Sequence, residues 1–259
     1  MNKTLGCVWD DAEDGALAMA RDEATLETLQ NGEGLDFLLR AHRWATPTVT
    51  LGRAQGVPPE LLADARAAGV RVARRPTGGG WLLHLPGDLA LTFAVRGPLG
   101  PGDLRTAARR TAQGIAAGLT ACGAPALVFG GMAQPATRAE VCFMRADRDE
   151  VLVGETKVAG VALARFGRSA LVQSALPLVS ATPELRAFAA RWDPKRDEAA
   201  AASASPDHRG LWRAAAAELS RLLRAETREW TWPAANAARA LDLLASKYAR
   251  DEFTVSGRI

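Results

Sequence analysis

The sequence is poor in cysteine and in histidine, with three of each among 259 residues. The three cysteines, Cys7, Cys122 and Cys142, lie far apart, and no Cys-x-x-Cys pair occurs. An odd and scattered set of this kind argues against a disulfide framework, and it offers no spacing typical of a structural zinc site. We therefore expect no metal in the site and a protein of a reducing compartment, the cytoplasm.

Long apolar runs are also missing. No stretch of about 18 uncharged apolar residues exists, so no membrane-spanning helix and no membrane partner are expected. The N-terminal segment reaches Asp10 and Asp11 without an apolar core, which argues against a secretory signal. The formal net charge is only +3 and the basic residues are scattered, which predicts no nucleic-acid partner.

What is present predicts an α/β (α+β) fold with a mixed β-sheet. The expected strands cover residues 5–10, 35–44, 48–53, 70–75, 81–85, 88–95, 126–130, 150–154, 157–167 and 169–179. The expected helices cover residues 15–29, 58–69, 103–122, 209–224 and 233–250. Strands 81–85 and 88–95 are expected to pair with each other across Pro86 and Gly87. We expect residues 1–180 to form the core and residues 181–259 to be a C-terminal helical segment packed on the same domain, with a low-complexity link at residues 197–207.

Three consecutive glycines, Gly78, Gly79 and Gly80, lie between two expected strands. A glycine run is costly in backbone entropy, and it usually serves a close approach to a ligand or main-chain N–H groups turned toward an anion. Arg74 and Arg75 precede the run, and strand alternation puts them on opposite faces, so only one should point at a site. The run matches neither GxGxxG nor GxxxxGK[ST]. On its own it is equally compatible with a plain hairpin.

The segment 74–93, RRPTGGGWLLHLPGDLALTF, resembles the RR-x-[TS]-GGG-x-x-x-H-x-x-G-[DN] block of the biotin/lipoate protein ligase and octanoyltransferase superfamily. Residues 16–24 are similar to its N-terminal helix, and residues 44–55 to its W-x-x-P-x-[LV]-x-[LI]-G-x-x-Q segment. Residues 155–165 are similar to its GxKxxGxAxxR strand, and residues 243–253 to the end of its catalytic domains. The ordered blocks cover most of the chain and resemble catalytic domains of the lipoate–protein ligase A and lipoyl-octanoyl transferase type.

This resemblance implies a mixed β-sheet with helices packed on one side, and a site for an acyl group. It assigns substrate binding to Arg75, Thr77, Gly78, Gly79, Gly80 and His84, and catalysis to Lys157. In that superfamily the lysine contacts the acyl carbonyl or an adenylate phosphate. His84 would shape the pocket or assist proton transfer, or it would be a satisfied polar core residue. The biotin-type GRGRxGR segment is absent, which disfavours biotin chemistry.

Cys142 lies fifteen residues before Lys157 and is followed by Phe143, as in one octanoyltransferase branch of that superfamily. A cation beside a thiol favours the thiolate, which is the nucleophile. The resemblance therefore makes Cys142 and Lys157 the catalytic pair. Cys142 is otherwise a small buried hydrophobe, the usual role of a free cysteine and the one expected for Cys7 and Cys122.

Three functions remain open at this point. The first is transfer of an octanoyl group from acyl carrier protein, through a cysteine thioester and without a cofactor, to a lysine of a lipoyl-carrier domain of the 2-oxoacid dehydrogenase E2 or glycine cleavage H protein type. The second is a lipoate–protein ligase that uses ATP and Mg and proceeds through lipoyl-AMP. The third is a non-catalytic lipoyl-binding relative, suggested because Gln173 and Ser174 stand where many members have His-Gly.

Overall fold

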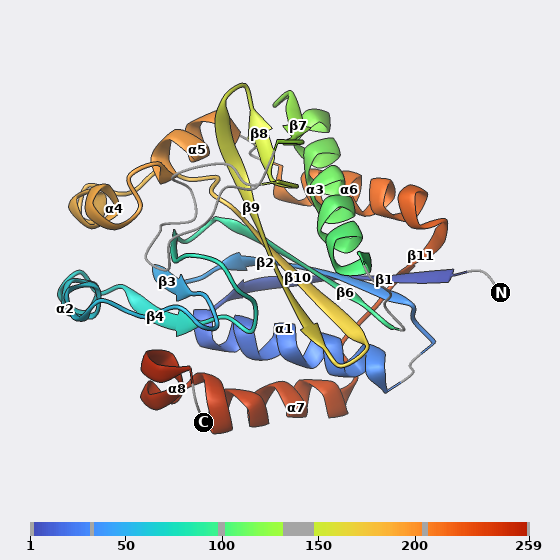
Figure 1. Ribbon diagram of the computed structural model, residues 1–259, viewed down its shortest axis with the longest axis horizontal. Helices are drawn as coiled ribbons and strands as arrows, with labels where there is room; N and C mark the ends of the chain where they lie inside the picture. The colour runs from blue at the N-terminus through green and yellow to red at the C-terminus, as the bar shows by residue number, and fades with distance from the viewer. Residues whose placement is uncertain (1–2, 32–33, 98–101, 132–147, 204–206, 258–259) are drawn as a thin grey trace.

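The computed structural model describes residues 3–31, 34–97, 102–131, 148–203 and 207–257 (Figure 1). Its centre is an eight-stranded sheet in the order β11-β1-β2-β6-β10-β9-β8-β7. These strands are β1 (Lys3–Glu13), β2 (Phe37–Trp44), β6 (Leu89–Val95), β7 (Ala126–Val128), β8 (Val151–Val153), β9 (Thr156–Phe166), β10 (Ser169–Leu176) and β11 (Ala225–Glu229). β1 runs parallel to β2 and to β11, and the other neighbours are antiparallel. The expected mixed α/β class is confirmed.

A separate three-stranded sheet has the order β4-β3-β5 and consists of β3 (Thr48–Leu51), β4 (Arg71–Arg74) and β5 (Leu82–His84). The expected pairing of strands 81–85 and 88–95 is wrong, because β5 pairs with β3 whereas β6 pairs with β2 and β10. The turn between them is fixed by Asp88, whose carboxylate accepts hydrogen bonds from the N–H groups of Leu85 (2.8 Å) and Leu178 (2.9 Å). This turn carries the chain from one sheet to the other.

Side chains close the outer edge of β5. The carboxylate of Asp193 accepts a hydrogen bond from the N–H of Leu83 at 3.0 Å. The guanidinium of Arg196 donates to the carbonyl of Leu83 at 3.2 Å and to the carboxylate of Asp88 at 2.6 Å. Both groups are almost fully buried. They give the middle of β5 the hydrogen bonds that a further strand would otherwise supply.

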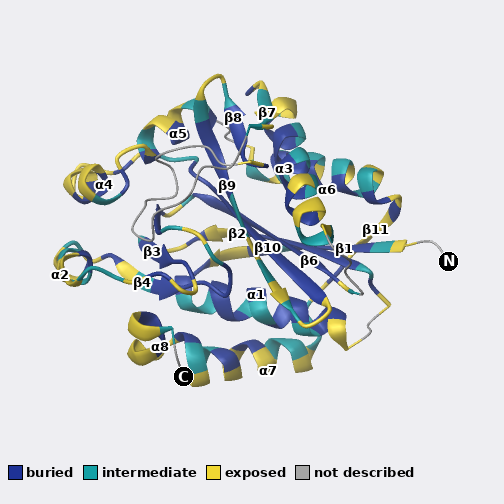
Figure 2. Ribbon diagram, in the orientation of Figure 1, coloured by how far each residue is buried: buried dark blue, intermediate teal, exposed yellow. Residues whose placement is uncertain are grey.

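Helices cover both faces of the large sheet, which corrects the expectation of helices on one side. Helix α1 (Gly15–Gln30) and helix α7 (Ala234–Leu243) lie on one face, and α3 (Asp103–Ala121) and α6 (His208–Leu223) on the other (Figure 1). Adjacent residues of β10 show why: Leu171 packs against Leu26 of α1, whereas Val172 packs against Leu219 of α6. The central strands are consequently buried on both faces (Figure 2).

The C-terminal part of the chain is only partly as expected. It contains α4 (Arg186–Trp192), α5 (Arg196–Ser203), α6, α7, a π-helical turn (Leu244–Tyr248) and α8 (Asp251–Ser256). It also supplies β11, so the expectation of an all-helical segment is wrong. Most of the supposed link at residues 197–207 belongs to α5. The remaining helix, α2 (Pro59–Ala67), begins at a proline as expected. No helix within the described ranges is both long and apolar enough to cross a bilayer.

Arg74 fastens the C-terminal helix α8 to the small sheet. Its guanidinium is buried and donates to six main-chain carbonyl oxygens, those of Gly52, Arg53, Gln55, Phe253, Thr254 and Val255. The three acceptors in α8 lie about 180 residues further along the chain than Arg74. A single side chain therefore holds two distant chain segments together.

We expect Arg74→Met to lower the free energy of unfolding by about 3 kcal/mol or more, because several buried carbonyl groups lose their donor. The matched control is Arg71→Met on the same strand, since the Arg71 side chain is 63% exposed and its ion pair with Asp14 should contribute below about 1 kcal/mol. Urea denaturation measures both variants, and limited proteolysis reports release of α8. Equal stability of the two variants would contradict the role assigned to Arg74.

Candidate functional site

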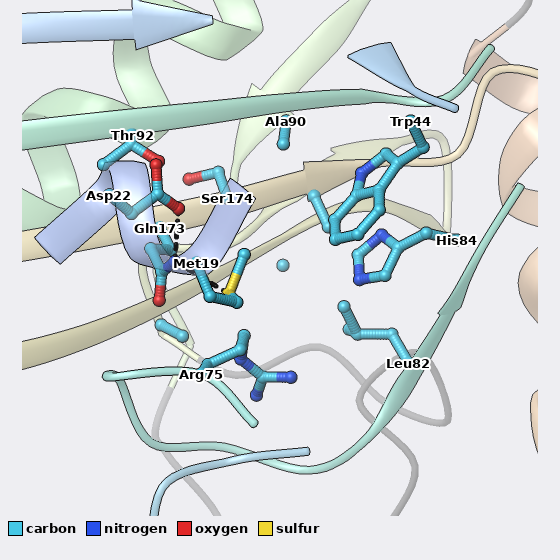
Figure 3. A pocket seen from close by; sticks show the side chains of 13 residues that line it. Met19, Asp22, Trp44, Arg75, Leu82, His84, Ala90, Thr92, Gln173 and Ser174 are labelled. Carbon is cyan, nitrogen blue, oxygen red and sulfur yellow. Dashed lines mark hydrogen bonds between the residues drawn. The ribbon is translucent and has the colours of Figure 1, made fainter. Parts of the chain in front are cut away.

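A pocket lies on the α1 face of the large sheet, between that sheet and β5 (Figure 3). Its floor is a row of very small residues on neighbouring strands: Ala175 of β10 stands opposite Gly160 of β9 and opposite Ala90 of β6. The cavity between the walls is small, about 30 Å³. The lining residues are Met19, Asp22, Trp44, Arg75, Leu82, His84, Ala90, Thr92, Gly160, Ala162, Gln173, Ser174 and Ala175. The small side chains of the row give the pocket an apolar floor.

One wall of the pocket is formed by two stacked rings. The imidazole of His84 lies parallel to the indole of Trp44, with ring centroids 3.8 Å apart and planes inclined by 14°. His84 Nε2 lies 2.8 Å from Thr50 Oγ1. Burial, reinforced by the positive charges of Arg75 and Arg196, holds the pKa of His84 well below its usual value. A neutral, stacked and hydrogen-bonded histidine is suited to shaping the wall, whereas a proton donor would need a higher pKa.

The glycine loop packs tightly against Gly52 at the end of β3. Gly79 has φ +94°, a conformation that residues with a side chain rarely adopt. A Cβ atom on Gly52 would lie only 1.9 Å from the carbonyl oxygen of Gly79. The N–H of Arg53 donates to the carbonyl of Thr77 at 2.7 Å. Glycine is therefore required at two facing positions so that the loop can lie against the small sheet.

Arg75 acts as a clamp on this loop. Its guanidinium donates to the carbonyl oxygens of Gly78 (2.8 Å) and Gly80 (2.9 Å), and on the other side to the carbonyl (2.9 Å) and hydroxyl (2.8 Å) of Thr50. Arg75 lines the pocket while Arg74 faces α8, as the alternation of the strand predicted. Arg75, which was expected to bind substrate, thus donates its terminal N–H groups to neighbouring oxygens of the protein.

A β-bulge in β9 determines where Lys157 points. Ala159 and Lys157 pair with consecutive residues of β8, so Val158 is an extra residue. Val158 and Ala159 both pack in the core beneath α3, whereas Gly160 lines the pocket on the opposite face. The extra residue shifts the alternation by one and brings Lys157 back to the face that carries Gly160.

Lys157 is buried together with two acidic groups. Its ammonium donates to the carboxylate of Glu150 at 2.7 Å. The second acidic group is Asp193. Burial raises the pKa of its carboxyl to about 7, although the N–H of Leu83 and the charges of Arg196 and Lys157 act in the opposite direction. Lys157, Glu150 and Asp193 are therefore all buried near the end of β9.

A polar wall faces the stacked rings across the pocket. Gln173 stands next to Ala162 and Thr92 in the sheet, and Thr92 stands next to Arg40. The carbonyl oxygen of the Gln173 side chain accepts a hydrogen bond from the hydroxyl of Thr77 at 2.6 Å. Its amide nitrogen donates to the carboxylate of Asp22 at 2.5 Å (Figure 3).

Several of these residues were missing from the sequence-based candidates, namely Met19, Asp22, Trp44 and the small residues of the pocket floor. The structure brings together Arg75, Thr77, the three glycines and His84. Lys157 is not among the residues that line the pocket; it lies three residues before Gly160 on β9 and is paired with Glu150. The ALAMARDEA segment was noted, but only the packing of α1 shows which of its side chains reach the pocket.

The three cysteines differ in what the structure describes. Cys142 lies outside the described residues. Cys7 is buried in β1, where burial raises the pKa of its thiol to about 11, so it is a poor nucleophile. Cys122 is partly exposed just after α3, with its sulfur 3.8 Å from the carbonyl oxygen of Asp207. Within the described ranges, histidine, cysteine and carboxylate side chains form no cluster of three or more that could hold a metal ion.

The chain is similar in sequence to known proteins. Octanoyltransferase LipM of Symbiobacterium thermophilum is 36% identical over 154 residues, which cover 57% of this chain and 55% of that protein. Octanoyltransferase LipM of Moorella thermoacetica is 34% identical over 170 residues, which cover 62% of this chain and 60% of that protein. The matches therefore span less than two thirds of the curated relatives.

The fold is shared with solved lipoate–protein ligases. The crystal structure of lipoate–protein ligase A bound with ATP superposes with a TM-score of 0.77 at 21% identity, covering all of both chains. The bipartite lipoate protein ligase of Thermoplasma acidophilum, described with its E2 lipoyl domain, gives a TM-score of 0.73 at 21% identity, covering 100% of this chain and 98% of that one.

A model of the lipoyl protein ligase A/B catalytic domain matches residues 14–229. That range contains the pocket, the glycine loop and the lysine strand. The chain belongs to the family of lipoyl protein ligase A/B catalytic domains.

Proposed function

We propose that this protein transfers an octanoyl group from acyl carrier protein to a lysine of a lipoyl-carrier domain. The observation that carries the proposal is the Cys142–Phe143 pair, fifteen residues before Lys157, in a chain 34–36% identical to octanoyltransferases over the matched segments. A nucleophilic thiol near a cation is needed for transfer through an enzyme thioester. The ligase chemistry does not need it.

The transfer proceeds in two exchanges. The Cys142 thiolate attacks the carbonyl carbon of the octanoyl thioester, and the thiolate of the carrier protein leaves. The ε-amine of the acceptor lysine then attacks the new thioester, an amide forms, and the Cys142 thiolate leaves while the nitrogen loses a proton. In this proposal Lys157 stabilises the negative charge that develops on the carbonyl oxygen in both exchanges.

The pocket supplies the binding energy for the acyl chain. Its floor of Gly160, Ala175 and Ala90 and the Trp44–His84 wall are apolar, and burying each methylene group contributes about 0.8 kcal/mol. Arg75, Thr77 and the loop from Gly78 to Gly80 form the border of the pocket. We propose that residues 1–180 provide this core and residues 181–259 complete the same domain.

The residues present do not fit the phosphates of ATP well. Arg75, the arginine that borders the pocket, has its terminal N–H groups directed to protein oxygens. A nucleotide would have to displace these partners to obtain a counter-charge. We therefore derive no step through ATP.

The proposed acceptors are the lipoyl-carrier domains of the E2 or H protein type.

The decisive test is Cys142→Ala incubated with octanoyl-acyl carrier protein and a lipoyl domain, without ATP. Intact-mass spectrometry of the wild type should show an octanoyl adduct that is absent from the variant, and the lipoyl domain should become octanoylated only with the wild type. Cys122→Ala is the matched control and should behave as the wild type. Modification that needs free lipoate and ATP and survives Cys142→Ala would establish the ligase instead. No modification under either condition would favour a binding protein.

Lys157→Met should lose both stability and activity, because Glu150 stays buried without its lysine at a cost of about 3–5 kcal/mol. The double variant Lys157→Met, Glu150→Gln removes both charges and should recover most of the stability. Its rate of transfer should still be lower by about 10²–10³-fold, the usual effect of removing an oxyanion donor. Thermal unfolding and single-turnover transfer measure the two effects. A double variant as fast as the wild type would exclude a catalytic role for Lys157.

Ala175→Val should shorten the pocket, since the added methyl groups enter the hollow between Gly160 and Ala90. We expect the preference for octanoyl over hexanoyl to fall about tenfold, as two methylene groups contribute about 1.6 kcal/mol. Ala164→Val is the control, because Ala164 lies on the same face of β9 beyond the lining residues. Competition between the two acyl carrier thioesters gives the ratio. An unchanged ratio for Ala175→Val would show that the acyl chain lies elsewhere.

A further inference from the structure

Gln173 joins three separate parts of the molecule. It lies on β10, its side-chain oxygen is bonded to Thr77 of the glycine loop, and its amide nitrogen is bonded to Asp22 of α1. Asp22 in turn binds the buried guanidinium of Arg40 on β2 at 2.6 Å. A continuous line of hydrogen bonds therefore runs from the glycine loop to the fully buried guanidinium of Arg40.

The amide of Gln173 has its orientation fixed at both ends. The carboxylate of Asp22 accepts only and therefore requires the amide nitrogen on its side, which leaves the amide oxygen to accept from the hydroxyl of Thr77. All three side chains are buried: Thr77 is 0% exposed, Asp22 1% and Gln173 6%. A buried polar group without its partner costs about 1–3 kcal/mol, so this arrangement resists rotation of the amide.

The loop is thus held from two directions. Arg75 binds the carbonyl oxygens of Gly78 and Gly80 on the side of the small sheet, and Gln173 binds Thr77 on the side of the large sheet. The sheet neighbours of Gln173 are Ala162 and Thr92, both shorter than glutamine, so the Gln173 amide extends past them to Thr77. On the side of the large sheet, the Gln173 side chain therefore links the loop to β10.

We propose that Gln173 is a positioning residue, which sets the glycine loop at the spacing from the pocket floor that the acyl thioester requires. This inference rests on the proposed acyl transfer. Gln173 forms no bond with the reacting atoms and acts through the loop. Its contribution should appear in kcat, since a displaced loop changes the alignment of the thioester more than its binding.

Gln173→Glu gives a test that depends on a proton. A protonated glutamic acid has the shape of glutamine: its carbonyl oxygen accepts from Thr77 and its O–H donates to Asp22. An ionised glutamate places two carboxylates side by side and has no donor for Asp22. The charged and titratable groups around this position are Asp22 and Arg40 on one side and Arg75 and His84 on the other. Its neighbours on β6 and β9 carry no charge.

The expected result is a kcat that recovers as the pH falls. The ratio of kcat for Gln173→Glu to kcat for the wild type, measured at each pH between about 5.5 and 8.5, should rise at least about tenfold toward low pH. Because Cys142 is present in both proteins, the effect of its titration on kcat cancels in the ratio. Gln173→Met has the same length and no hydrogen bonds, so its ratio should be low and flat. Gln30→Glu, at an exposed position bonded to the carbonyl of Phe166, is the control and should remain near one.

A flat ratio for Gln173→Glu, or full kcat for Gln173→Met, would overturn the inference. Thermal melting of each variant at each pH separates loss of fold from loss of positioning. If the wild type transfers no octanoyl group, the proposed function fails while this inference keeps an independent readout. Hydrogen exchange of residues 75–80 should then be faster in Gln173→Met than in the wild type, and unchanged exchange would count against the positioning role.

Discussion

The register of β6, β10 and β9 is the constraint on which the site depends. In this register Gly160, Ala175 and Ala90 fall in one row on the face of α1. Their chain neighbours Ala159, Leu176 and Leu91 pack in the core on the side of α3. A slip of one residue would bring Leu91 and Val161 into the pocket and fill it. The same three strands therefore carry a hollow on one face and a dense core on the other, and the bulge at Val158 lets Lys157 join the hollow face.

The buried charges of the α1 face serve position more than stability. Arg40 is fully buried and binds Asp10, Glu13 and Asp22, which lie on β1 and α1. Such a cluster recovers little more than its desolvation cost, but it penalises any shift of one element against another. Because Asp22 also binds Gln173, the position of α1 is transmitted to the pocket. The buried charges of Arg40 and Asp22 therefore help to fix the position of the polar wall.

The local sequence patterns correctly predicted the features that depend on local backbone geometry. Alternation placed Arg74 and Arg75 on opposite faces, and the glycine run marked a loop of close backbone contact, now seen between Gly79 and Gly52. The pairing of β5 could not be read in the same way, because WLLHL is apolar enough for either sheet and Asp88 fixes the turn through contacts with distant Leu178. The role of Gln173 depends on Asp22, 151 residues away in the chain.

The expectations for the C-terminal part of the chain, a helical segment and a link, were wrong at β11 and α5. The strand β11 reads AETRE, a polar sequence with no strand signal of its own, and its place is decided by pairing with β1. Likewise α5 consists mainly of small residues that its sequence shares with flexible linkers, and its burial against Leu82 and Ala175 makes it a helix of the core. For β11 the tertiary contacts outweigh the local preference, whereas the alanine run of α5 favours a helix by itself.

The closed edge of β5 has a consequence for the behaviour of the protein in solution. An open strand edge recruits the edge of another molecule, and such pairing leads to fibrils or mixed dimers. Here the carboxylate of Asp193 and the guanidinium of Arg196 occupy the donor and acceptor of Leu83 from within the chain. The β5 edge of the small sheet is thereby blocked from pairing with a strand of another molecule at Leu83.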